Sequence, residues 1–227
     1  VNPTQFAPHE DFGSYPRTWK ADMEKLAEER ADLVWNPGVD VMYPPNFATR
    51  ISPEGPATAD LEDRFRPHFF GGVATVVGKL FTQCRPDIAV FGQKDYQQLK
   101  VITEMARQFA LPTEVVGAPT VRAEDGLALS SRNGYLAEAE RQEATALPYT
   151  LRTLADRARA PGSTLAALEQ EAMDALRARG WAPDYLTLRR RSDLLPPTDE
   201  QRLGHEPLVA LGAARLGATR LIDNSEC

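Results

Sequence analysis

A short polar turn joins an apolar segment to an amphipathic helix in the middle of the chain. The apolar residues 88–91 predict a strand, and Gly92-Gln93-Lys94-Asp95 separates it from the helix. In a parallel sheet this position presents free N–H groups and the positive end of the helix dipole, which together bind anions. Gly92 would admit a ligand close to the backbone, Lys94 would supply charge for phosphate, and Asp95 would accept from ribose hydroxyls. The alternative is an ordinary glycine turn in which Asp95 caps the helix and Lys94 is solvated.

A second polar turn, Ser130-Ser131-Arg132-Asn133, has a composition that suits an anion. It offers two hydroxyls, a guanidinium fork and several backbone N–H groups, which are the donors of an anion cradle. The alternative is a plain polar turn with Asn133 near its tip. Four residues alone do not decide between the two.

Amide side chains at two places could bind a polar substrate. Gln97 and Gln98 open the helix after the lysine turn, and one of them should point over the strand ends. There an amide can both donate to and accept from a polyhydroxy carboxylate. Asn2, Thr4 and Gln5 form a second polar group near the start of the chain. The alternative is solvation for the glutamines and a disordered terminus for the other group.

Several common kinds of site are not predicted. The histidines and cysteines have no metal-ligand spacing, so we expect no metal held by the protein's own side chains. Neither a Gly-x-Ser-x-Gly elbow nor a Walker loop occurs, which argues against hydrolase and P-loop classes. The run Arg189-Arg190-Arg191 is interpreted as a solvated edge.

Charge and hydropathy limit the partners. A net charge of −6 gives no general attraction to nucleic acid, so any affinity for phosphate must be local. The sequence has neither a long apolar window nor a secretion signal at residue 1. We therefore expect a cytoplasmic protein with no nucleic-acid or membrane partner.

The elements that must position these residues predict an α/β protein. Helical periodicity marks residues 15–31, 72–84 and 96–109, short apolar runs mark strands at 32–35, 88–91 and 113–116, and residues 44–67 have the composition of a long surface loop. The 15–31 helix is expected to lie on the sheet. Alternation of helices and strands predicts a parallel sheet with helices on its faces.

Beyond Thr120 the pattern changes. Helices are expected over 137–159 and 163–179, the second capped by Ser163, and strands at 185–188, 208–211 and 220–223. Helices followed by strands indicate a smaller α+β unit. We place the boundary near Thr120.

Several of these motifs together resemble the pantothenate synthetase family. The stretches that carry the resemblance are Asn2-Pro3-Thr4-Gln5-Phe6, Tyr15-Pro16-Arg17-Thr18, residues 72–77, residues 91–98, Ser130-Ser131-Arg132-Asn133 and residues 219–224. They occur in the family's order and cover nearly the whole chain. The resemblance implies a Rossmann-like ATP- and pantoate-binding domain over 1–120 and a smaller α+β lid domain over 121–227.

The resemblance also implies a reaction and its site residues. The family condenses (R)-pantoate with β-alanine through a pantoyl-adenylate, consuming ATP with Mg²⁺ and releasing diphosphate and AMP. The positions that match its ATP-binding residues are Gly92, Gln93, Lys94, Asp95, Val121, Leu129, Ser130, Ser131 and Arg132. Gln5 and Gln98 match the pantoate-binding residues, and Gln5 also matches the β-alanine site. Lys94, Asn2 and Arg132 are the expected catalytic residues, and a homodimer is the expected assembly.

The sequence departs from the family pattern at three places. The family's His-x-Gly-His motif, which precedes the Asn-Pro-Thr-Gln stretch, has no counterpart, so we expect a missing N-terminal segment. Leu129 stands where the family commonly has Met. His68 is displaced by one position from the family's histidine, and no role is carried onto it. Two alternatives stay open: a catalytically inactive remnant that only binds pantoate or nucleotide, and a related adenylylating enzyme acting on another acid.

Overall fold

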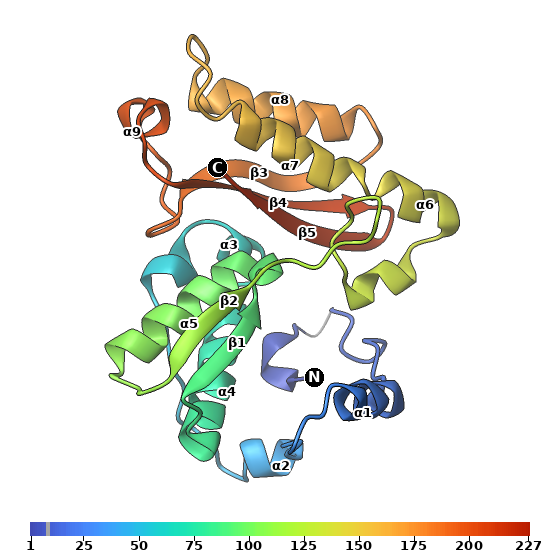
Figure 1. The fold of residues 1–227 in the computed structure, drawn as a ribbon, viewed down its shortest axis with the longest axis vertical. Coiled ribbons are helices and arrows are strands. Elements are labelled where there is room, and N and C mark those ends of the chain that lie inside the picture. The colour runs from blue at the N-terminus through green and yellow to red at the C-terminus, as the bar shows by residue number, and fades with distance from the viewer. Residues whose placement is uncertain (8–9) are drawn as a thin grey trace.

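The computed structural model describes residues 1–7 and 10–227. Its N-terminal half contains η1 (Pro3–Gln5), α1 (Trp19–Glu28), α2 (Val39–Met42), η2 (Gly55–Thr58), α3 (Glu62–Phe65), α4 (Phe69–Cys84), β1 (Ile88–Gly92), η3 (Gln93–Asp95), α5 (Tyr96–Gln108) and β2 (Glu114–Ala118). Its C-terminal half contains η4 (Ser131–Tyr135), α6 (Glu138–Glu143), α7 (Ala146–Asp156), α8 (Leu165–Arg177), β3 (Ala182–Arg190), α9 (Asp199–Leu203), β4 (Leu208–Leu216) and β5 (Thr219–Glu226). Figure 1 shows the two halves one above the other.

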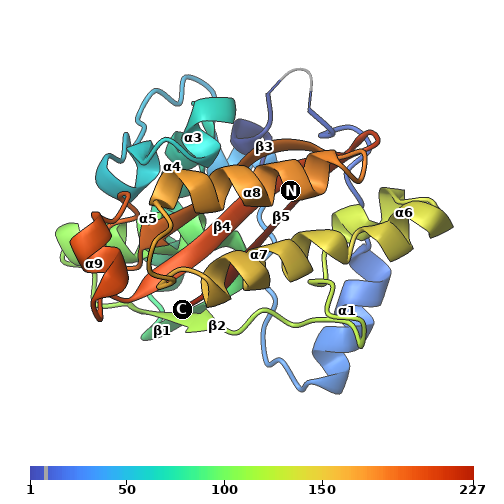
Figure 2. The same cartoon turned by 90° about the horizontal axis from the view of Figure 1, so that it is seen from above.

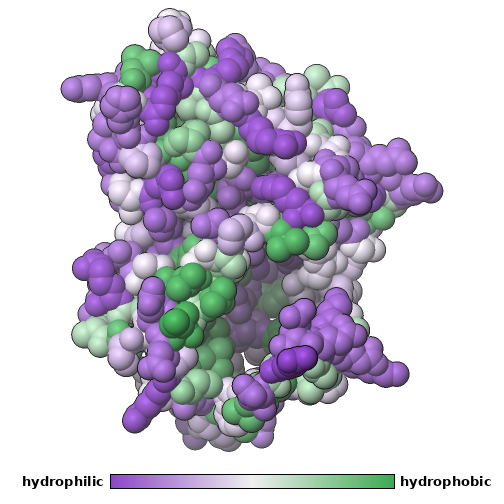
Figure 3. Space-filling view, in the orientation of Figure 1, coloured by the Kyte–Doolittle hydropathy of each residue, from purple (hydrophilic) through white to green (hydrophobic). Residues whose placement is uncertain are grey.

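The N-terminal half is built on β1 and β2, which pair in parallel from Ile88 opposite Glu114 to Gly92 opposite Ala118. Helices α4 and α5 cover one face of this pair, where apolar side chains of both helices, including Val73 and Ile102, form a core. On the other face the side chains of Ile88 and Val90 are 57% and 64% exposed. Figure 3 shows apolar surface over this sheet. The parallel pairing confirms the α/β class.

The C-terminal half is a three-stranded antiparallel sheet in the order β3-β4-β5. Helices α7 and α8 lie together on one face (Figure 2) and bury a leucine-rich core that includes Leu151, Leu168 and Leu188. At Gly212 in β4 an added Cβ would lie 3.0 Å from a methyl group of Leu151, so glycine lets α7 approach the sheet. The expected α+β arrangement is therefore confirmed, with Thr164 rather than Ser163 as the cap of α8.

The opposite face of this sheet packs on the N-terminal half. Val209 and Leu211 of β4 join Leu61 and Tyr96 in a cluster that is buried between the halves. Strand β4 is consequently buried on both faces. The change from one sheet to the other falls between β2 and β3, and the boundary near residue 120 stays a prediction.

Two sequence predictions in the N-terminal half are wrong. Residues 32–35 form no strand, and Leu33 is 84% exposed, because an apolar run that short needs a neighbouring strand for its backbone hydrogen bonds. Helix α1 exists, but none of its residues is buried, so it does not lie on the sheet. Figure 1 shows it at the edge of the molecule. Helical periodicity predicts a helix without specifying the surface that it covers.

The segment 44–67 is also more ordered than a surface loop. It forms η2 and α3, and Ala57, Leu61 and Glu62 are buried. The buried amide of Gln97 holds the segment, because it accepts from the Glu62 backbone N–H (2.9 Å) and donates to the Pro56 carbonyl (2.8 Å). The Gln97 side chain, which is distant in sequence, therefore orders the segment 44–67, whose sequence shows no periodicity.

The arginine run is not a solvated edge. Arg189 is buried, Arg190 pairs with Asp193, and Arg191 pairs with Glu226. Because the sheet is covered on both faces, Arg189 of β3 is buried, and its Nε has no hydrogen-bond partner among the described residues, whereas Arg190 and Arg191 pair with carboxylates.

Truncation of Leu151 tests the core of the C-terminal half. Leu151→Ala removes a fully buried side chain and should lower the free energy of unfolding by about 2–5 kcal/mol, measured by urea denaturation. The matched control is Leu33→Ala, which changes a leucine in the exposed segment 32–35 and should shift the free energy by less than about 0.5 kcal/mol. Equal losses in the two variants would contradict this assignment of core and surface.

Candidate functional site

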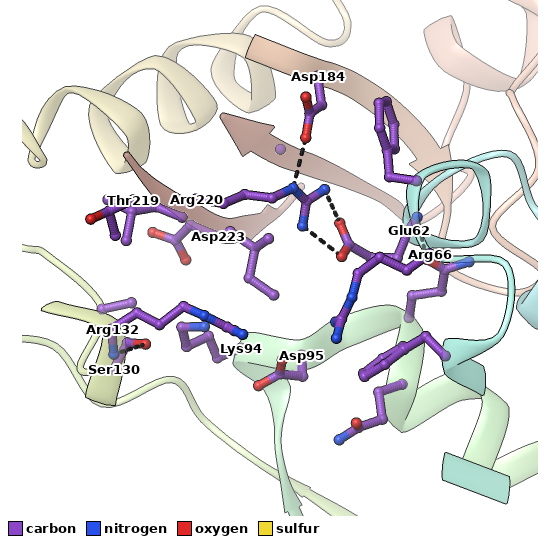
Figure 4. Close-up of a pocket in the computed structure, with 18 of the residues that line it drawn as sticks. Glu62, Arg66, Lys94, Asp95, Ser130, Arg132, Asp184, Thr219, Arg220 and Asp223 are labelled. Carbon is purple, nitrogen blue, oxygen red and sulfur yellow. Dashed lines mark hydrogen bonds and ion pairs between the residues drawn. The ribbon is translucent and has the colours of Figure 1, made fainter. Parts of the chain in front are cut away.

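A cavity of about 700 Å³ lies between the two halves of the molecule. Of the twelve residues that the family resemblance assigned to the site, seven line this cavity: Asn2, Gln5, Lys94, Asp95, Gln98, Ser130 and Arg132. Figure 4 shows Lys94, Ser130 and Arg132 on one side of this cavity and Arg220 with Glu62 on another. Five are not among its lining residues: Gly92, Gln93, Val121, Leu129 and Ser131. Val121 and Leu129 are instead 67% and 55% exposed.

The lysine turn lies at the carboxyl end of β1, as expected. Strand β1 ends at Gly92, and η3 carries Lys94 and Asp95 to the start of α5. The Gln93 side chain packs against Gly117 of β2, where an added Cβ would come within 3.2 Å of its Cγ. Gln93 thus fixes the turn to the sheet, whereas Lys94 and Asp95 face the cavity.

The serine-arginine turn is tied to the start of the chain. Ser130 caps η4 by accepting from the Arg132 backbone N–H at 3.3 Å. The Arg132 guanidinium donates from Nε and Nη2 to the two carboxylate oxygens of Asp11, at 3.2 and 3.0 Å. The Ser131 hydroxyl lies 2.8 Å from the hydroxyl of Tyr15. This turn is therefore held in place by the segment 11–15.

The pair of Asp11 and Arg132 is electrostatically stable. Partial burial raises the pKa of the Asp11 carboxyl, but the hydrogen bonds and charge of Arg132 outweigh it and hold that pKa below its usual range. Burial lowers the pKa of Arg132, and Asp11 more than restores it. Both groups are charged at neutral pH, so Arg132 presents a permanent cation at the cavity.

The polar group at the start of the chain is ordered, which excludes the disordered-terminus interpretation. The Asn2 side-chain oxygen accepts from the backbone N–H and hydroxyl of Thr4 and from the Tyr43 hydroxyl, at 3.3, 3.1 and 2.8 Å. At Gly72 an added Cβ would lie 2.4 Å from the Thr4 carbonyl oxygen, so only glycine admits η1 against α4. This close approach places Gln5 at the cavity.

The two glutamines after the lysine turn have different roles. Both line the cavity, but Gln97 is buried and its amide is occupied by the Glu62 N–H, the Pro56 carbonyl and the Asp63 carboxylate. Gln98 is the glutamine whose amide remains for a ligand.

An ion-pair network that the sequence did not predict crosses the cavity. Arg220 of β5 donates to both oxygens of Glu62, each at 2.7 Å, and from Nε to Asp184 at 2.7 Å. Tyr185 donates to the same Glu62 carboxylate at 2.9 Å. Glu62 and Arg220 are 158 residues apart, so no local pattern could pair them. In the sequence, the only feature that marked this network was the charged segment 44–67, which contains Glu62 and shows no helical or strand periodicity.

The protonation of this network follows from its geometry. Burial raises the pKa of Glu62, but the hydrogen bonds and charge of Arg220 lower it below its usual range. Burial raises the pKa of the Tyr185 hydroxyl well above its usual value, with the Glu62 charge adding to the effect. At neutral pH the network is an ionised carboxylate held by a cation and a neutral phenol.

Arg66 is another residue of the cavity wall. Arg66 donates to both oxygens of Glu10 and to the Gln5 carbonyl, so it braces the segment that carries Gln5. His68 precedes α4 and is not among the residues lining the cavity.

In the part of the chain that the structure describes, no group of three or more His, Cys, Asp or Glu side chains could hold a metal ion. The helices of residues 1–7 and 10–227 are all too short or too polar to cross a membrane.

The fold and the cavity are typical of an enzyme that binds a phosphorylated substrate between two structural units. The family model described as pantoate-beta-alanine ligase matches residues 1–226. A pantothenate synthetase 2 from Bradyrhizobium diazoefficiens is 59% identical over 224 residues, which cover 99% of this chain and 78% of the relative. A pantothenate synthetase from Leptothrix cholodnii is 57% identical over 227 residues, covering 100% of this chain and 79% of the relative. The chain belongs to the pantoate–β-alanine ligase family.

Solved structures agree with this assignment. A pantothenate synthetase from Thermus thermophilus has a TM-score of 0.90 and 45% identity, covering 99% of this chain and 80% of that structure. The ligase from Francisella tularensis, complexed with beta-gamma ATP and β-alanine, has a TM-score of 0.77 and 30% identity, covering 99% and 76%. The family and fold predictions are confirmed. The expectation of a missing N-terminal segment is not confirmed by these alignments.

Replacement of Glu62 tests the network between the halves. Glu62→Gln leaves the Arg220 cation with Asp184 alone and should lower the free energy of unfolding by about 3 kcal/mol at pH 7, measured by urea denaturation. The native pKa of Glu62 is lowered, so its contribution is present above the unfolded-state value of about 4.3 and is lost as the pH falls below it. The difference in the free energy of unfolding between the parent chain and Glu62→Gln should therefore be smaller in acid than at pH 7.

The matched control is Glu28→Gln on the exposed helix α1. It should change the free energy of unfolding by less than about 0.5 kcal/mol both at pH 7 and in acid. A Glu62→Gln loss that does not depend on pH would show that the carboxylate charge is not what stabilises the arrangement.

Proposed function

We propose that this chain catalyses the reaction of its family, the ATP-dependent condensation of pantoate with β-alanine to give pantothenate, AMP and diphosphate. The observation that carries the proposal is the convergence of the Lys94 turn and the Ser130–Arg132 turn on one cavity. The relative from Francisella tularensis supports it, because that ligase is complexed with beta-gamma ATP and β-alanine.

In this proposal the triphosphate lies between the two cationic turns. Lys94 binds phosphate as a point charge, Arg132 binds it as a planar fork, and Asp95 accepts from the ribose. The Arg132 guanidinium uses Nε and Nη2 for Asp11, which leaves Nη1 to donate to phosphate. Gly92, Gln93, Val121, Leu129 and Ser131 do not line the cavity, and in this proposal they belong to the segments that position it, with Gln93 packed on Gly117 and the Ser131 hydroxyl against Tyr15.

The acid and the amine are assigned to the glutamine side chains of the same cavity. Gln5 and Gln98 bind the hydroxyls and carboxylate of pantoate, because each amide can donate and accept at the cavity wall. Gln5 also borders the β-alanine site. Asn2 orients this region through its bonds to Thr4 and Tyr43, with its Nδ2 3.5 Å from the Gly72 carbonyl.

The chemistry has two steps, and positioning and electrostatics supply the rate. First, a pantoate carboxylate oxygen attacks the α-phosphorus, the bond from that phosphorus to the diphosphate oxygen breaks, and Lys94 and Arg132 neutralise the charge that leaves. Second, the neutral amine of β-alanine attacks the acyl carbon, the C–O bond to AMP breaks, and the amine loses a proton to solvent. The walls that the two halves contribute limit the access of water to the mixed anhydride.

Three finer assignments belong to the same proposal. Mg²⁺ would be held chiefly by phosphate oxygens, and the Asp95 carboxylate at the cavity suits a cation that prefers oxygen ligands. Bound there, it would neutralise phosphate charge. We also propose a homodimer and a cytoplasmic location.

The function is tested by measuring AMP release from ATP with the 227-residue chain. AMP formation that requires both pantoate and β-alanine supports the proposal. Diphosphate release that proceeds faster with another acid than with pantoate would favour a related adenylylating enzyme. No turnover, with pantoate or nucleotide still bound, would favour an inactive binding protein.

Lys94→Ala tests the lysine turn directly. Removing a cation that faces the leaving diphosphate should lower the rate of pantoate-dependent diphosphate release by about 100-fold, with little change in urea denaturation. Lys20→Ala, on the exposed helix α1, is the matched control and should leave the rate unchanged. Loss of folded protein instead of activity would mean that Lys94 is structural.

A further inference from the structure

We propose that Asn224, a residue of β5, is a positioning residue for Lys94. The inference rests on the proposed role of Lys94 in binding phosphate. Asn224 belongs to the C-terminal half and affects the reaction by holding the lysine turn in place.

The contacts of Asn224 are specific to that turn. Its side-chain Nδ2 donates to the carbonyl of Gln93 at 2.8 Å and to the carbonyl of Lys94 at 2.9 Å. Asn224 is buried, so these bonds are shielded from water. Both hydrogens of one amide therefore hold two consecutive peptide groups, one of them Lys94's own.

The lysine turn lies where η3 passes into α5. Asp95, at this junction, has φ −90° and ψ 62°, outside helical geometry, so the turn is not part of one continuous helix. The two bonds from the Asn224 amide hold the Gln93 and Lys94 carbonyls from β5 and so fix the direction in which the Lys94 side chain leaves the backbone.

The neighbouring residue on β5 connects the other cationic turn to the same strand. Asp223 accepts from both Nη atoms of Arg122, at 2.7 and 3.0 Å, and Arg122 also donates to the carbonyls of Gly126 and Asn224. Arg122 pairs with Ala128 in a short antiparallel bridge that leads directly into Ser130. Asp223 and Asn224 thus set the spacing between the two turns that the proposed reaction needs.

Asn224 itself is fixed by this arrangement. Its backbone N–H donates to Asp223 Oδ1 at 2.8 Å, while its carbonyl accepts from Arg122 at 3.2 Å. The two amide hydrogens serve both carbonyls, which the aspartate of the same shape could not do, since a carboxylate accepts but does not donate. Asparagine is the residue that this position requires.

A double-mutant cycle on kcat/KM for ATP tests the inference, with pantoate-dependent diphosphate release as the assay. Asn224→Ala should lower kcat/KM about 10- to 100-fold in the parent chain, because misplacing a group by about 1 Å costs up to about 100-fold. In the Lys94→Ala background the same change should cost less than about threefold, because the group that it positions is gone. Gln170→Ala, which removes an amide bonded to Asp174 on the exposed face of α8, is the control and should have no effect in either background.

The other possible outcomes test the inference on Asn224 and the proposed role of Lys94 separately. An equal loss in both backgrounds would overturn the inference and leave the role of Lys94 intact, as would an Asn224→Ala variant with full activity. A Lys94→Ala variant with unchanged kcat/KM would overturn the proposed role of Lys94 and with it the inference. Asn224→Ser keeps one donor at shorter reach and should give an intermediate loss. If the Ala and Ser variants both fail to fold, Asn224 is a structural residue and the inference is wrong.

Discussion

The ion pair between Glu62 and Arg220 is the interaction on which the arrangement of this molecule depends. It joins α3 to β5 across the cavity with two bonds of 2.7 Å, and Asp184 and Tyr185 complete it from β3. Removing both charges from water is costly, so the pair specifies one relative position of the halves rather than adding general cohesion. The apolar cluster of Leu61, Tyr96, Val209 and Leu211 supplies that cohesion beside it.

Fixing the halves in this way creates the site. One cationic turn comes from the end of β1, and the other follows the antiparallel bridge between Arg122 and Ala128, so neither half holds both. The chain carries a net charge of −6, so in the proposed function the attraction for phosphate is local and comes from Lys94 and Arg132, which both line the cavity. Polar partners hold both turns: the Asp11 carboxylate orients Arg132, and the Asn224 amide holds the carbonyls of Gln93 and Lys94. Cations held in this way need little reorganisation when a charged substrate binds.

The sequence predicted what local patterns encode. A short apolar run predicted strand β1 and helical periodicity predicted α5, and their junction placed Lys94 at a strand end, where the structure also has it. The strand at 32–35 failed because strand formation depends on a neighbour that an apolar run does not specify. Glu62, Arg220 and Asn224 were missed because each acts through a partner more than 100 residues away. Val121 and Leu129 matched the family by position, but their side chains face solvent, which similarity of sequence does not report.

The most direct test of this account is a crystal structure of the chain with pantoate and a non-hydrolysable ATP analogue. The account predicts one triphosphate between the halves, with Lys94 Nζ and an Arg132 guanidinium nitrogen each about 3 Å from its phosphate oxygens. A triphosphate bound outside the cavity, or one that touches neither turn or only one of them, would contradict it.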